Sequence, residues 1–471
     1  MPRSVCIHPD NRQAVALALE RNGFLTQGDL AAHLEIARST VSNFFRGVKI
    51  SIAKFEEISE ALGLEAREII QSQDSEPQLA STPEVSQTTF YAYDQDWVGR
   101  EELVANLHAQ VQGTCRLMMI TGIAGVGKTA LSERLSLELS EFGTPLQENF
   151  DAEDRSIDFS SFAARLLEKF GQGVTPSDRA DIAQLLTRLI QALQTTPRLL
   201  LIDSLEELLQ GNEKEGWSEF QDEAFLSFFQ HVLSTEQFQS RIVVTSQALP
   251  SQLLTYGSRY RSTWATQLLT GLSSSEQLAL FDKTGLDVSP DAEAYSTLVR
   301  MGKAYEGHPL ALRIISGEIG GKPFFGDVLA YWNRYGHEIE AVETAIAEAE
   351  AGQVVGADDK WRLDRFTREL RRNVRARLEQ TLQRLRQDAK FAYILLCEAS
   401  VYRCAVPEDW WLSHLEYWDC NEETRENALD ALKDRFLVEE AISAGDYTLR
   451  QHALIRSVSL DHLNQLDQVY E

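Results

Sequence analysis

The sequence has 471 residues, is 43% hydrophobic and carries a formal net charge of −26. A chain of this length is expected to form roughly two to four globular domains, and so acidic a body excludes a protein that coats nucleic acid over its whole surface. No apolar run approaches the roughly 20 residues of a membrane span. The five scattered cysteines and the absence of a signal-peptide pattern lead us to expect a cytoplasmic protein without membrane contact.

The first 72 residues differ from the rest in charge. They hold eight Lys and Arg against nine Asp and Glu, a balance of −1, which leaves −25 for the remainder. Apolar spacing predicts four helices, with a three-residue turn between the second and the third: 11–21, 27–33, 38–47 and 51–62. Two short helices joined by such a turn are typical of a helix-turn-helix, so we predict an all-α domain of this kind over residues 1–72.

The second helix of this motif carries short polar side chains and arginines, which suit base edges and phosphates. The candidate DNA-binding residues are Arg38, Ser39, Thr40, Ser42, Asn43 and Arg46. The stretches Leu25–Ala31 and Ser39–Phe44 resemble the second and third helices of phage-repressor-like regulators. Because the domain is almost neutral, the same helices could equally dock a protein, and both roles stay open.

Residues 73–95 are predicted to be a flexible linker. Gln, Ser, Thr, Pro and Glu dominate from Gln71 to Thr89, with almost no apolar side chains to form a core. The helix-turn-helix domain is therefore expected to swing relative to the chain that follows.

The stretch Gly122–Thr129 fits the phosphate-loop pattern G-x-x-x-x-G-K-[ST]. An apolar strand from Leu117 to Ile120 precedes it, and an amphipathic helix follows. Glycines let backbone N–H groups approach a phosphate chain, and the helix adds its positive end. The nucleotide-binding candidates here are Gly122, Gly125, Gly127, Lys128, Thr129 and Ala130, with Lys128 reaching the β- and γ-phosphates and Thr129 binding Mg²⁺.

A second buried strand, Leu199–Ile202, ends in Asp203. Such an apolar run is typical of a parallel sheet, and Asp203 at its carboxyl end would hold the Mg²⁺ of the nucleotide. Glu206 or Glu207 would orient the attacking water, which makes these three carboxylates the catalytic candidates. A third strand, 241–246, ends at Gln247, so the order of motifs predicts an α/β P-loop NTPase core with a parallel sheet over residues 96–265.

Six motifs occur in the order found in STAND NTPases, the NB-ARC and NACHT switch proteins of apoptosis, plant immunity and bacterial regulation and defence. They are Val98–Glu101, the phosphate loop, Asp203–Glu207, Val244–Ser246, Gly307–Leu312 and Gln451–Leu454. The resemblance implies a small helical domain over 266–345 and a winged-helix domain over 360–471. It also implies that ATP or ADP lies between these parts, with Val98 and Arg100 beside the adenine, Pro309 near the base and His452 reaching the β-phosphate of ADP.

Three departures from this family's pattern affect the expectation. Gln247 stands where the family often has an arginine that senses the γ-phosphate, so ATP hydrolysis is expected to be slow at most. Ala453 replaces the frequent Asp after the histidine. Most relatives also continue into repeats that read the trigger, and no repeat of roughly 20–50 residues is found here.

The C-terminal third is predicted in less detail. The arginine-rich stretch 362–390 is expected to be a helix with a solvated face. The winged helix is predicted to begin at 392–396, to have its second and third helices at 409–411 and 428–436, and its wing strands at 436–438 and 447–449.

These expectations add up to a STAND-type nucleotide-dependent switch, closed with ADP and open with ATP. A homo-oligomer is expected in the ATP state, and the helix-turn-helix provides the output by binding DNA or a partner protein. Two alternatives stay open. One is a turning-over AAA+-like ATPase acting on DNA, as archaeal replication initiators are; the other is an adaptor whose nucleotide is structural.

Overall fold

The computed structural model describes the following residues: 4–5, 15, 18, 21–22, 30, 33–34, 41, 44–45, 50–64, 97–151, 158–212, 217–257, 259–351, 365–418, 420–443 and 446–470. The six candidate DNA-binding residues, Arg38, Ser39, Thr40, Ser42, Asn43 and Arg46, lie outside this set. No helix in the described part is long and apolar enough to cross a membrane.

The N-terminal segment has a small apolar core of its own. Residues from each of the four predicted helices meet in it: Val15, Ala18, Leu30, Val41, Phe44, Phe55, Ile58 and Leu62. The fourth of these helices is α4 (Ile52–Ala61), and strands β1 (Ser4–Val5) and β2 (Ile50–Ser51) pair antiparallel beside it. A shared core among short helices agrees with the predicted helix-turn-helix domain.

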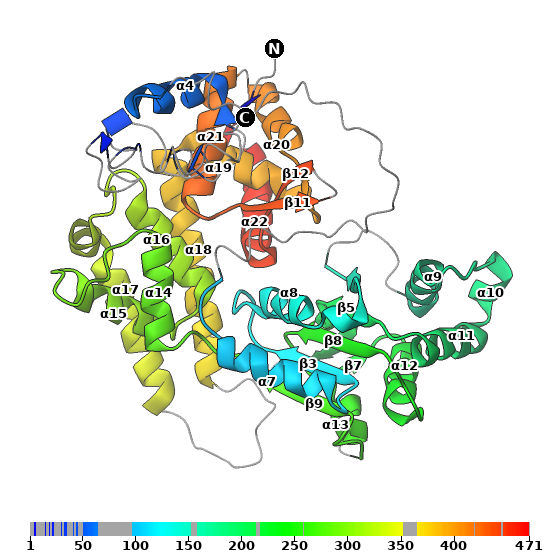
Figure 1. The fold of residues 1–471 in the computed structure, drawn as a ribbon. Helices are drawn as coiled ribbons and strands as arrows, with labels where there is room; N and C mark the ends of the chain where they lie inside the picture. Colours follow the sequence, from blue (N-terminus) through cyan, green and yellow to red (C-terminus); the bar gives the residue numbers. More distant parts are fainter. Residues whose placement is uncertain are drawn as a thin grey trace.

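The phosphate-loop domain is built on a five-stranded parallel sheet with the order β4-β5-β8-β3-β9, which lies in the lower part of Figure 1. Its strands are β3 (Leu117–Thr121), β4 (Leu146–Asn149), β5 (Leu199–Asp203), β8 (Arg241–Ser246) and β9 (Trp264–Leu268). Because β8 lies between β3 and β5, the phosphate loop after β3 and Asp203 at the end of β5 face each other across the end of β8. This edge of the sheet is where parallel α/β proteins bind ligands.

Successive side chains of a strand point to opposite faces of the sheet, so each central strand contributes to two separate cores. In β3, Leu117 and Met119 pack on one face of the sheet, whereas Met118 and Ile120 pack on the other. Helices α9 (Phe159–Lys169), α11 (Ile182–Thr195) and α12 (Glu223–Ser234) cover the first face; α7 (Glu101–Gln112) and α8 (Lys128–Glu138) cover the second. Full burial of each large apolar side chain stabilises the folded state by about 1.5–3 kcal/mol. The two cores therefore hold the sheet, and the residues at its edge, firmly in place.

Smaller elements complete the core domain. They are the 3-10 turns η2 (Ser140–Phe142) and η3 (Leu205–Leu208), the hairpin β6 (Leu209–Asn212) and β7 (Trp217–Phe220), and helices α10 (Pro176–Ala180) and α13 (Ser251–Gly257). Asp181 separates α10 from α11. The carboxylate of Asp181 accepts the backbone N–H of Gln184, so it caps α11 instead of continuing α10.

A group of helices follows the sheet: α14 (Ser274–Lys283), α15 (Tyr295–Ala304), α16 (Pro309–Gly320), α17 (Val328–Ala351) and α18 (Arg365–Asp388). Helix α16 is shared between two cores. Ala311, Leu312 and Ile315 belong to the core on the phosphate-loop face, whereas Leu310 and Ile314 belong to the core of the C-terminal region. A movement of α16 would therefore disturb both cores at once.

The C-terminal region has the order of elements of a winged helix. It contains α19 (Lys390–Glu398), η4 (Ala399–Val401), β10 (Val406–Pro407), α20 (Glu408–His414), η5 (Leu415–Trp418), α21 (Glu422–Asp434), β11 (Glu439–Ser443), β12 (Asp446–Arg450) and α22 (Ala453–Tyr470). The prediction of a strand at 436–438 was wrong. Phe436 adopts a left-handed conformation (φ 53°) and Leu437 and Val438 are buried in the core, so the first wing strand begins only at Glu439.

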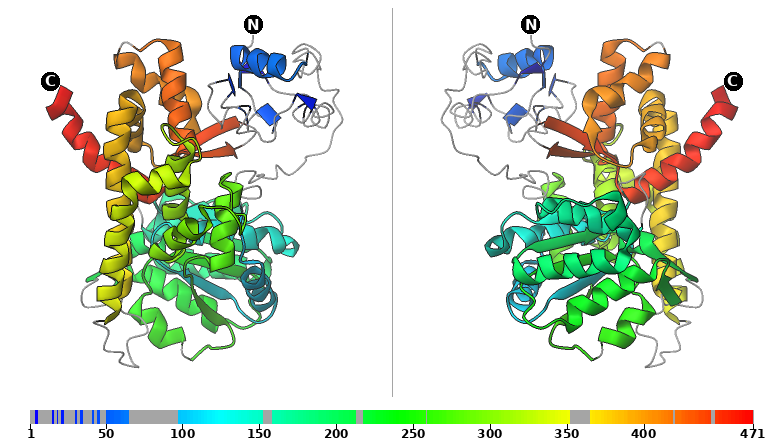
Figure 2. Two further views of the ribbon diagram at one scale, coloured as in Figure 1. Left: turned by 90° about the vertical axis from the view of Figure 1, so that its left-hand side faces the viewer. Right: turned by 90° about the vertical axis from the view of Figure 1, so that its right-hand side faces the viewer.

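Helix α18 joins the two halves of the molecule. Figure 2 shows it (yellow to gold) as one long helix running from the level of the parallel sheet up to the winged helix. Its Leu370 and Val374 pack in the core on the phosphate-loop face, whereas Leu378, Leu382 and Leu385 pack in the core of the C-terminal region. A helix anchored in both cores transmits displacement between them, because packed interiors deform little.

The prediction of a solvated arginine face on this helix was wrong for Arg377, whose side chain is fully buried. Arg377 and Arg384 both pair with Glu318 of α16 and Glu338 of α17, and Thr381 donates to Glu318 at 2.6 Å. Pairing with Arg377 and Arg384 overcomes the effect of burial and lowers the pKa of Glu318. This network fixes α16, α17 and α18 to one another, since removing one partner of a buried ion pair costs about 3–5 kcal/mol.

Candidate functional site

The phosphate loop runs from the end of β3 into α8. Gly127 caps the helix with φ 95°, and Gly125 has φ 79°. A Cβ at Gly125 would lie 2.8 Å from both His308 Cε1 and Leu310 Cδ2, so only glycine fits beneath the start of α16. The ammonium of Lys128 is buried and donates to the carbonyls of Gly122 and Ile123, at 3.0 and 3.1 Å. Lys128 thus folds back onto its own loop, where phosphate oxygens can replace the two carbonyls.

Asp203 lies opposite the loop. Thr129 Oγ1 donates to its carboxylate at 2.9 Å, and Thr245 of β8 donates to the same oxygen. Burial raises the pKa of Asp203, and the two hydroxyl donors oppose that rise. The predicted Mg²⁺ residues, Thr129 and Asp203, are therefore in contact.

These oxygens fit a hard cation such as Mg²⁺, which uses few protein ligands and takes the rest from phosphate and water. Within the described residues, no group of three or more His, Cys, Asp and Glu could hold a metal ion.

Glu206 and Glu207 have different surroundings. Glu206 accepts two hydrogen bonds from Gln247, from the backbone N–H at 3.1 Å and from Nε2 at 2.8 Å. Glu207 is more exposed; burial and the carboxylates of Asp151 and Glu206 raise its pKa. Of the two, Glu206 is the carboxylate fixed at the carboxyl ends of β5 and β8.

Arg100 reaches the phosphate loop from the start of α7. It adopts a left-handed conformation (φ 63°), and its backbone N–H donates to Glu276 at 2.6 Å. Its guanidinium donates to the carbonyls of Val126 and Thr270, at 3.0 and 2.9 Å. The preceding Val98 is partly buried against the core on this face of the sheet. Arg100 therefore stabilises the phosphate loop at Val126.

His308 belongs to this site, although the sequence indicated no role for it beyond its place in the motif Gly307–Leu312. It is buried at the N-terminus of α16, directly before Pro309, and caps the helix by accepting the N–H of Ala311 at 3.3 Å. Its other nitrogen, Nε2, donates to the carbonyl of Ala124 in the phosphate loop at 2.9 Å. Burial lowers the pKa of His308 to about 4, so the ring stays neutral with one donor and one acceptor.

His452 lies between β12 and α22, where its Nδ1 accepts the N–H of Leu454 at 3.1 Å. Burial lowers the pKa of His452, and the positive charges of Arg450 and Lys128 add to this effect. In turn, His452 is among the groups that lower the pKa of His308.

An ion pair also connects the C-terminal helix with the sheet. Arg456 of α22 donates to Asp151, two residues after the end of β4, at 2.8 Å, and both side chains are largely buried. This pair lies on the same side of the molecule as the loop, because β4 ends at the edge that carries Asp203. Figure 1 shows the lower end of α22 above α8.

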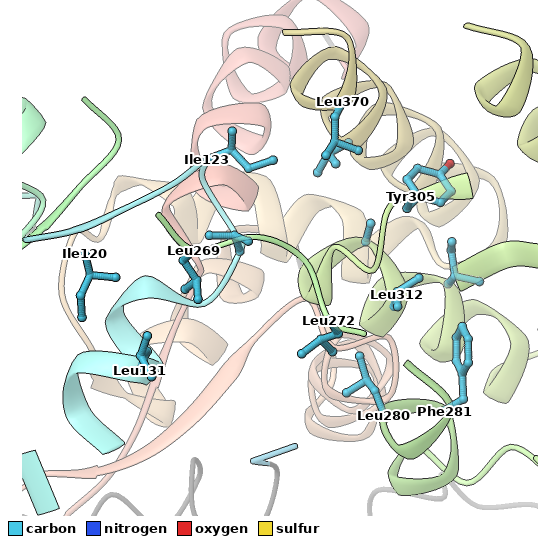
Figure 3. Packing of buried hydrophobic residues seen from close by; sticks show 14 of the residues in the cluster. Ile120, Ile123, Leu131, Leu269, Leu272, Leu280, Phe281, Tyr305, Leu312 and Leu370 are labelled. Carbon is cyan, nitrogen blue, oxygen red and sulfur yellow. The ribbon is translucent and has the colours of Figure 1, made fainter. Parts of the chain in front are cut away.

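The loop is also held by apolar contacts. Ile123 of the phosphate loop and Leu370 of α18 belong to one buried cluster, which Leu272 and Leu312 continue through the helical region (Figure 3). The phosphate loop is therefore packed against segments that come from far along the chain.

Glu133 is a buried carboxyl group on α8, one helical turn after Thr129, and its Oε2 lacks a hydrogen-bond partner among the described residues. Burial raises its pKa from 4.5 to about 8, with Asp203 and Glu439 adding to the rise and Arg450 opposing it. Glu133 is therefore protonated at neutral pH, unlike a solvated glutamate.

This environment makes the stability of the protein depend on pH. The proton on Glu133 stabilises the folded state below the unfolded pKa of 4.5, and that contribution is lost as pH rises to the folded value of about 8. We expect Glu133→Gln, which keeps a neutral side chain, to raise the melting temperature more at about pH 8.5 than at about pH 5.5. Thermal unfolding of both proteins across this range measures the effect, and parallel curves would contradict it.

Comparison with known protein families supports the P-loop domain and the helix-turn-helix domain. Residues 111–249 match the family model described as an AAA domain, and residues 25–69 match the model described as helix-turn-helix. The chain is 28% identical over 238 residues to an uncharacterized WD repeat-containing protein of Nostoc sp. (strain PCC 7120). That match covers 49% of this chain and 18% of the relative.

Solved structures resemble the chain only distantly. Cdc6p from Pyrobaculum aerophilum is 12% identical with a TM-score of 0.33, covering 81% of this chain and 97% of the other. The Orc1 protein of Aeropyrum pernix in complex with DNA has the same identity and TM-score, covering 81% and 98%. A chain of the HORMA:CdnC:Trip13 complex of E. coli MS115-1 is 14% identical with a TM-score of 0.31, covering 62% and 93%. Likeness of this degree does not bear on function.

The chain therefore combines an AAA-type P-loop domain with an N-terminal helix-turn-helix. The AAA match, the parallel sheet and the phosphate loop together indicate nucleotide binding.

Proposed function

We propose that this protein is a nucleotide-dependent molecular switch of the STAND type, with the domain boundaries that the sequence predicts. The observation that carries the proposal is that the phosphate loop and the sheet edge beside it are held by three segments from the C-terminal half. His308 of α16 bonds Ala124, Arg371 of α18 bonds Gln247 at 2.6 Å, and Arg456 of α22 bonds Asp151. An ATPase core alone does not need such contacts.

These contacts define a closed arrangement, and a different arrangement would break them together. α16, α17 and α18 are fixed to one another by the buried ion pairs of Arg377, so they would move as one body. A ligand shifts such an equilibrium only by binding one arrangement more tightly than the other. ADP would favour the closed arrangement through His452, and ATP would favour an open one that assembles into a homo-oligomer.

The nucleotide would lie among the residues already described. Lys128 and the loop would bind the β- and γ-phosphates, Thr129 and Asp203 would hold Mg²⁺, and the side chains of Val98, Arg100 and Pro309 would line the base. Glu206, held by Gln247, would orient the attacking water. A bound Mg²⁺ would stabilise the charge that develops on the phosphates.

The AAA-domain match, together with the helix-turn-helix match, favours a second candidate, an ATPase that turns over while acting on DNA. Denaturing the purified protein and identifying the released nucleotide by chromatography separates the two. The switch should retain ADP and hydrolyse ATP slowly with or without DNA. Loss of all nucleotide during purification, together with rapid DNA-stimulated turnover, would favour the second candidate.

The relative from Nostoc is consistent with the switch. By its name it contains WD repeats, and the sequence resemblance leads us to expect that most members of this class continue into repeats that read the trigger. This chain spans less than a fifth of that protein's length.

The output is proposed to pass through the helix-turn-helix. If this domain reads DNA, Arg46→Ala and Asn43→Ala should each weaken binding to a selected site by roughly 1–3 kcal/mol, and a dimer should prefer half-sites ~34 Å apart. Binding should also fall steeply with salt through counterion release. A selection from random DNA that enriches no sequence, with the full chain bound to either nucleotide, would favour a protein partner instead.

A further inference from the structure

Glu276, in the first turn of α14, connects the start of the helical region with the chain segment 97–100. Its carboxylate accepts two backbone N–H groups, that of Ser273 at 2.7 Å and that of Arg100 at 2.6 Å. The bond to Ser273 belongs to a capping box, which is a common way to begin a helix. The bond to Arg100 reaches a residue 176 positions earlier in the chain, and capping α14 does not require it.

This contact depends on an unusual backbone at Gly99 and Arg100. Gly99 has φ 67°, and a Cβ at this position would lie 2.2 Å from Glu276 Oε1, so only glycine lets the carboxylate approach. Arg100 has φ 63°, in the left-handed region that residues other than glycine seldom adopt. Such a conformation persists where the surrounding structure imposes it, and Glu276 supplies one of the contacts that do so.

Further hydrogen bonds hold the same segment. Lys283, the last residue of α14, donates to the carbonyl of Trp97 at 2.6 Å. The guanidinium of Arg100 donates to the carbonyls of Val126 and Thr270, at 3.0 and 2.9 Å. Helix α14 therefore binds a carbonyl at the beginning of segment 97–100 and an N–H at its end, while Arg100 connects the segment with the phosphate loop.

The charge of Glu276 strengthens this arrangement. Burial raises the pKa of Glu276, but its hydrogen bonds with Ser273 and Arg100 and the positive charge of Arg100 outweigh that effect, so the pKa is lowered. The carboxylate is therefore ionised at neutral pH. A hydrogen bond from an N–H to an ionised carboxylate is stronger than one between neutral groups, so Glu276 restricts the backbone at Arg100 tightly.

We propose that Glu276 is a positioning residue for the base end of the nucleotide, and that it acts through the backbone of segment 97–100. The inference rests on the proposed function, in which Val98 and Arg100 line the base. Glu276 holds this segment in one conformation, so that little ordering is needed when the base binds. The phosphates bind at the loop, where Lys128 is held by loop carbonyls. Loss of Glu276 should therefore weaken recognition of the base and leave phosphate binding unchanged.

The test compares a ligand that has a base with a ligand that has only phosphates. Displacement of a fluorescent ADP analogue from the full-length protein measures the affinities for ADP and for inorganic pyrophosphate, both with Mg²⁺. Glu276→Ala should weaken ADP by at least about tenfold and pyrophosphate by less than about threefold. Lys283→Ala, which removes the bond of α14 to Trp97, should also weaken ADP more than pyrophosphate.

Ser273→Ala is the matched control, because it removes the hydroxyl of the capping box and leaves the bond between Glu276 and Arg100 in place. It should lower the melting temperature by weakening the start of α14, and it should bind ADP and pyrophosphate as the wild type does. If Glu276 only capped its own helix, Glu276→Ala would give this same result.

Equal loss of ADP and pyrophosphate in Glu276→Ala, or no loss of either, would overturn the inference. Thermal unfolding shows whether each variant is folded, and if Glu276→Ala is not, Lys283→Ala tests the inference by the same two affinities. A wild-type protein that binds neither ligand would overturn the proposed function and this inference with it. If the wild type binds both and Lys128→Ala binds neither, an unchanged affinity for ADP in Glu276→Ala refutes only the role of Glu276.

Discussion

Lys128→Ala is expected to remove bound nucleotide from the purified protein. Lys128 is the buried cation of the phosphate loop, and its ammonium already donates to two loop carbonyls that phosphate oxygens can replace. Each charged hydrogen bond to phosphate is worth about 1.5–3 kcal/mol, so loss of two would weaken binding by roughly a hundredfold or more. The nucleotide content of the purified variant, measured by chromatography after denaturation, checks the result.

Lys303→Ala is the control for this experiment, because Lys303 is an exposed lysine on α15. It should retain as much nucleotide as the wild type. Asp203→Asn should spare ADP more than Mg²⁺-ATP, since its carboxylate is proposed to hold the metal ion. Equal nucleotide retention by Lys128→Ala and the wild type would refute the assignment of the site.

His452→Ala is expected to exchange ADP faster and to form a larger species on gel filtration with ATP. If this histidine bonds the β-phosphate of ADP only in the closed arrangement, losing about 1.5–3 kcal/mol would shift the closed-to-open ratio by roughly ten- to hundredfold. Release of a fluorescent ADP analogue measures the exchange. His337→Ala, at an exposed position on α17, should behave as the wild type does.

The double variant His452→Ala with Lys128→Ala should return to the monomer. The oligomer is proposed to need bound ATP, which the Lys128→Ala change removes. The double variant should therefore elute as a monomer on gel filtration even if His452→Ala opens the molecule. If His452→Ala alone keeps ADP as tightly as the wild type and stays the same size, His452 is only a structural residue of the winged helix.

The phosphate loop and Asp203 could be predicted because their chemistry is local in the sequence. Loop, strand and helix are adjacent in the chain, and β5 is an uninterrupted apolar run that ends in a carboxylate. Strand β4 was not predicted, since its Glu148 is buried by pairing with Arg165 and Lys169 and leaves no apolar pattern. An edge strand that buries a charged residue in an ion pair has the polar sequence pattern that is typical of a loop.

The contacts that close the site could not be predicted, because they join distant segments. Nothing local distinguishes Arg371 from Arg372, yet one reaches Gln247 and the other is exposed to solvent. The motif around His308 was recognised, but its bond to the carbonyl of Ala124 depends on how α16 packs against the loop. The buried position of Arg377 likewise follows from the packing of three helices.

The most direct test of this account is the size of the wild-type protein in its two nucleotide states. Small-angle X-ray scattering of one preparation, loaded with ADP or with a non-hydrolysable ATP analogue, measures the radius of gyration and the mass of each. We expect a compact monomer with ADP and a more extended or assembled species with the analogue. Identical scattering from both samples, with both nucleotides shown to be bound, would contradict the proposal that this protein is a switch.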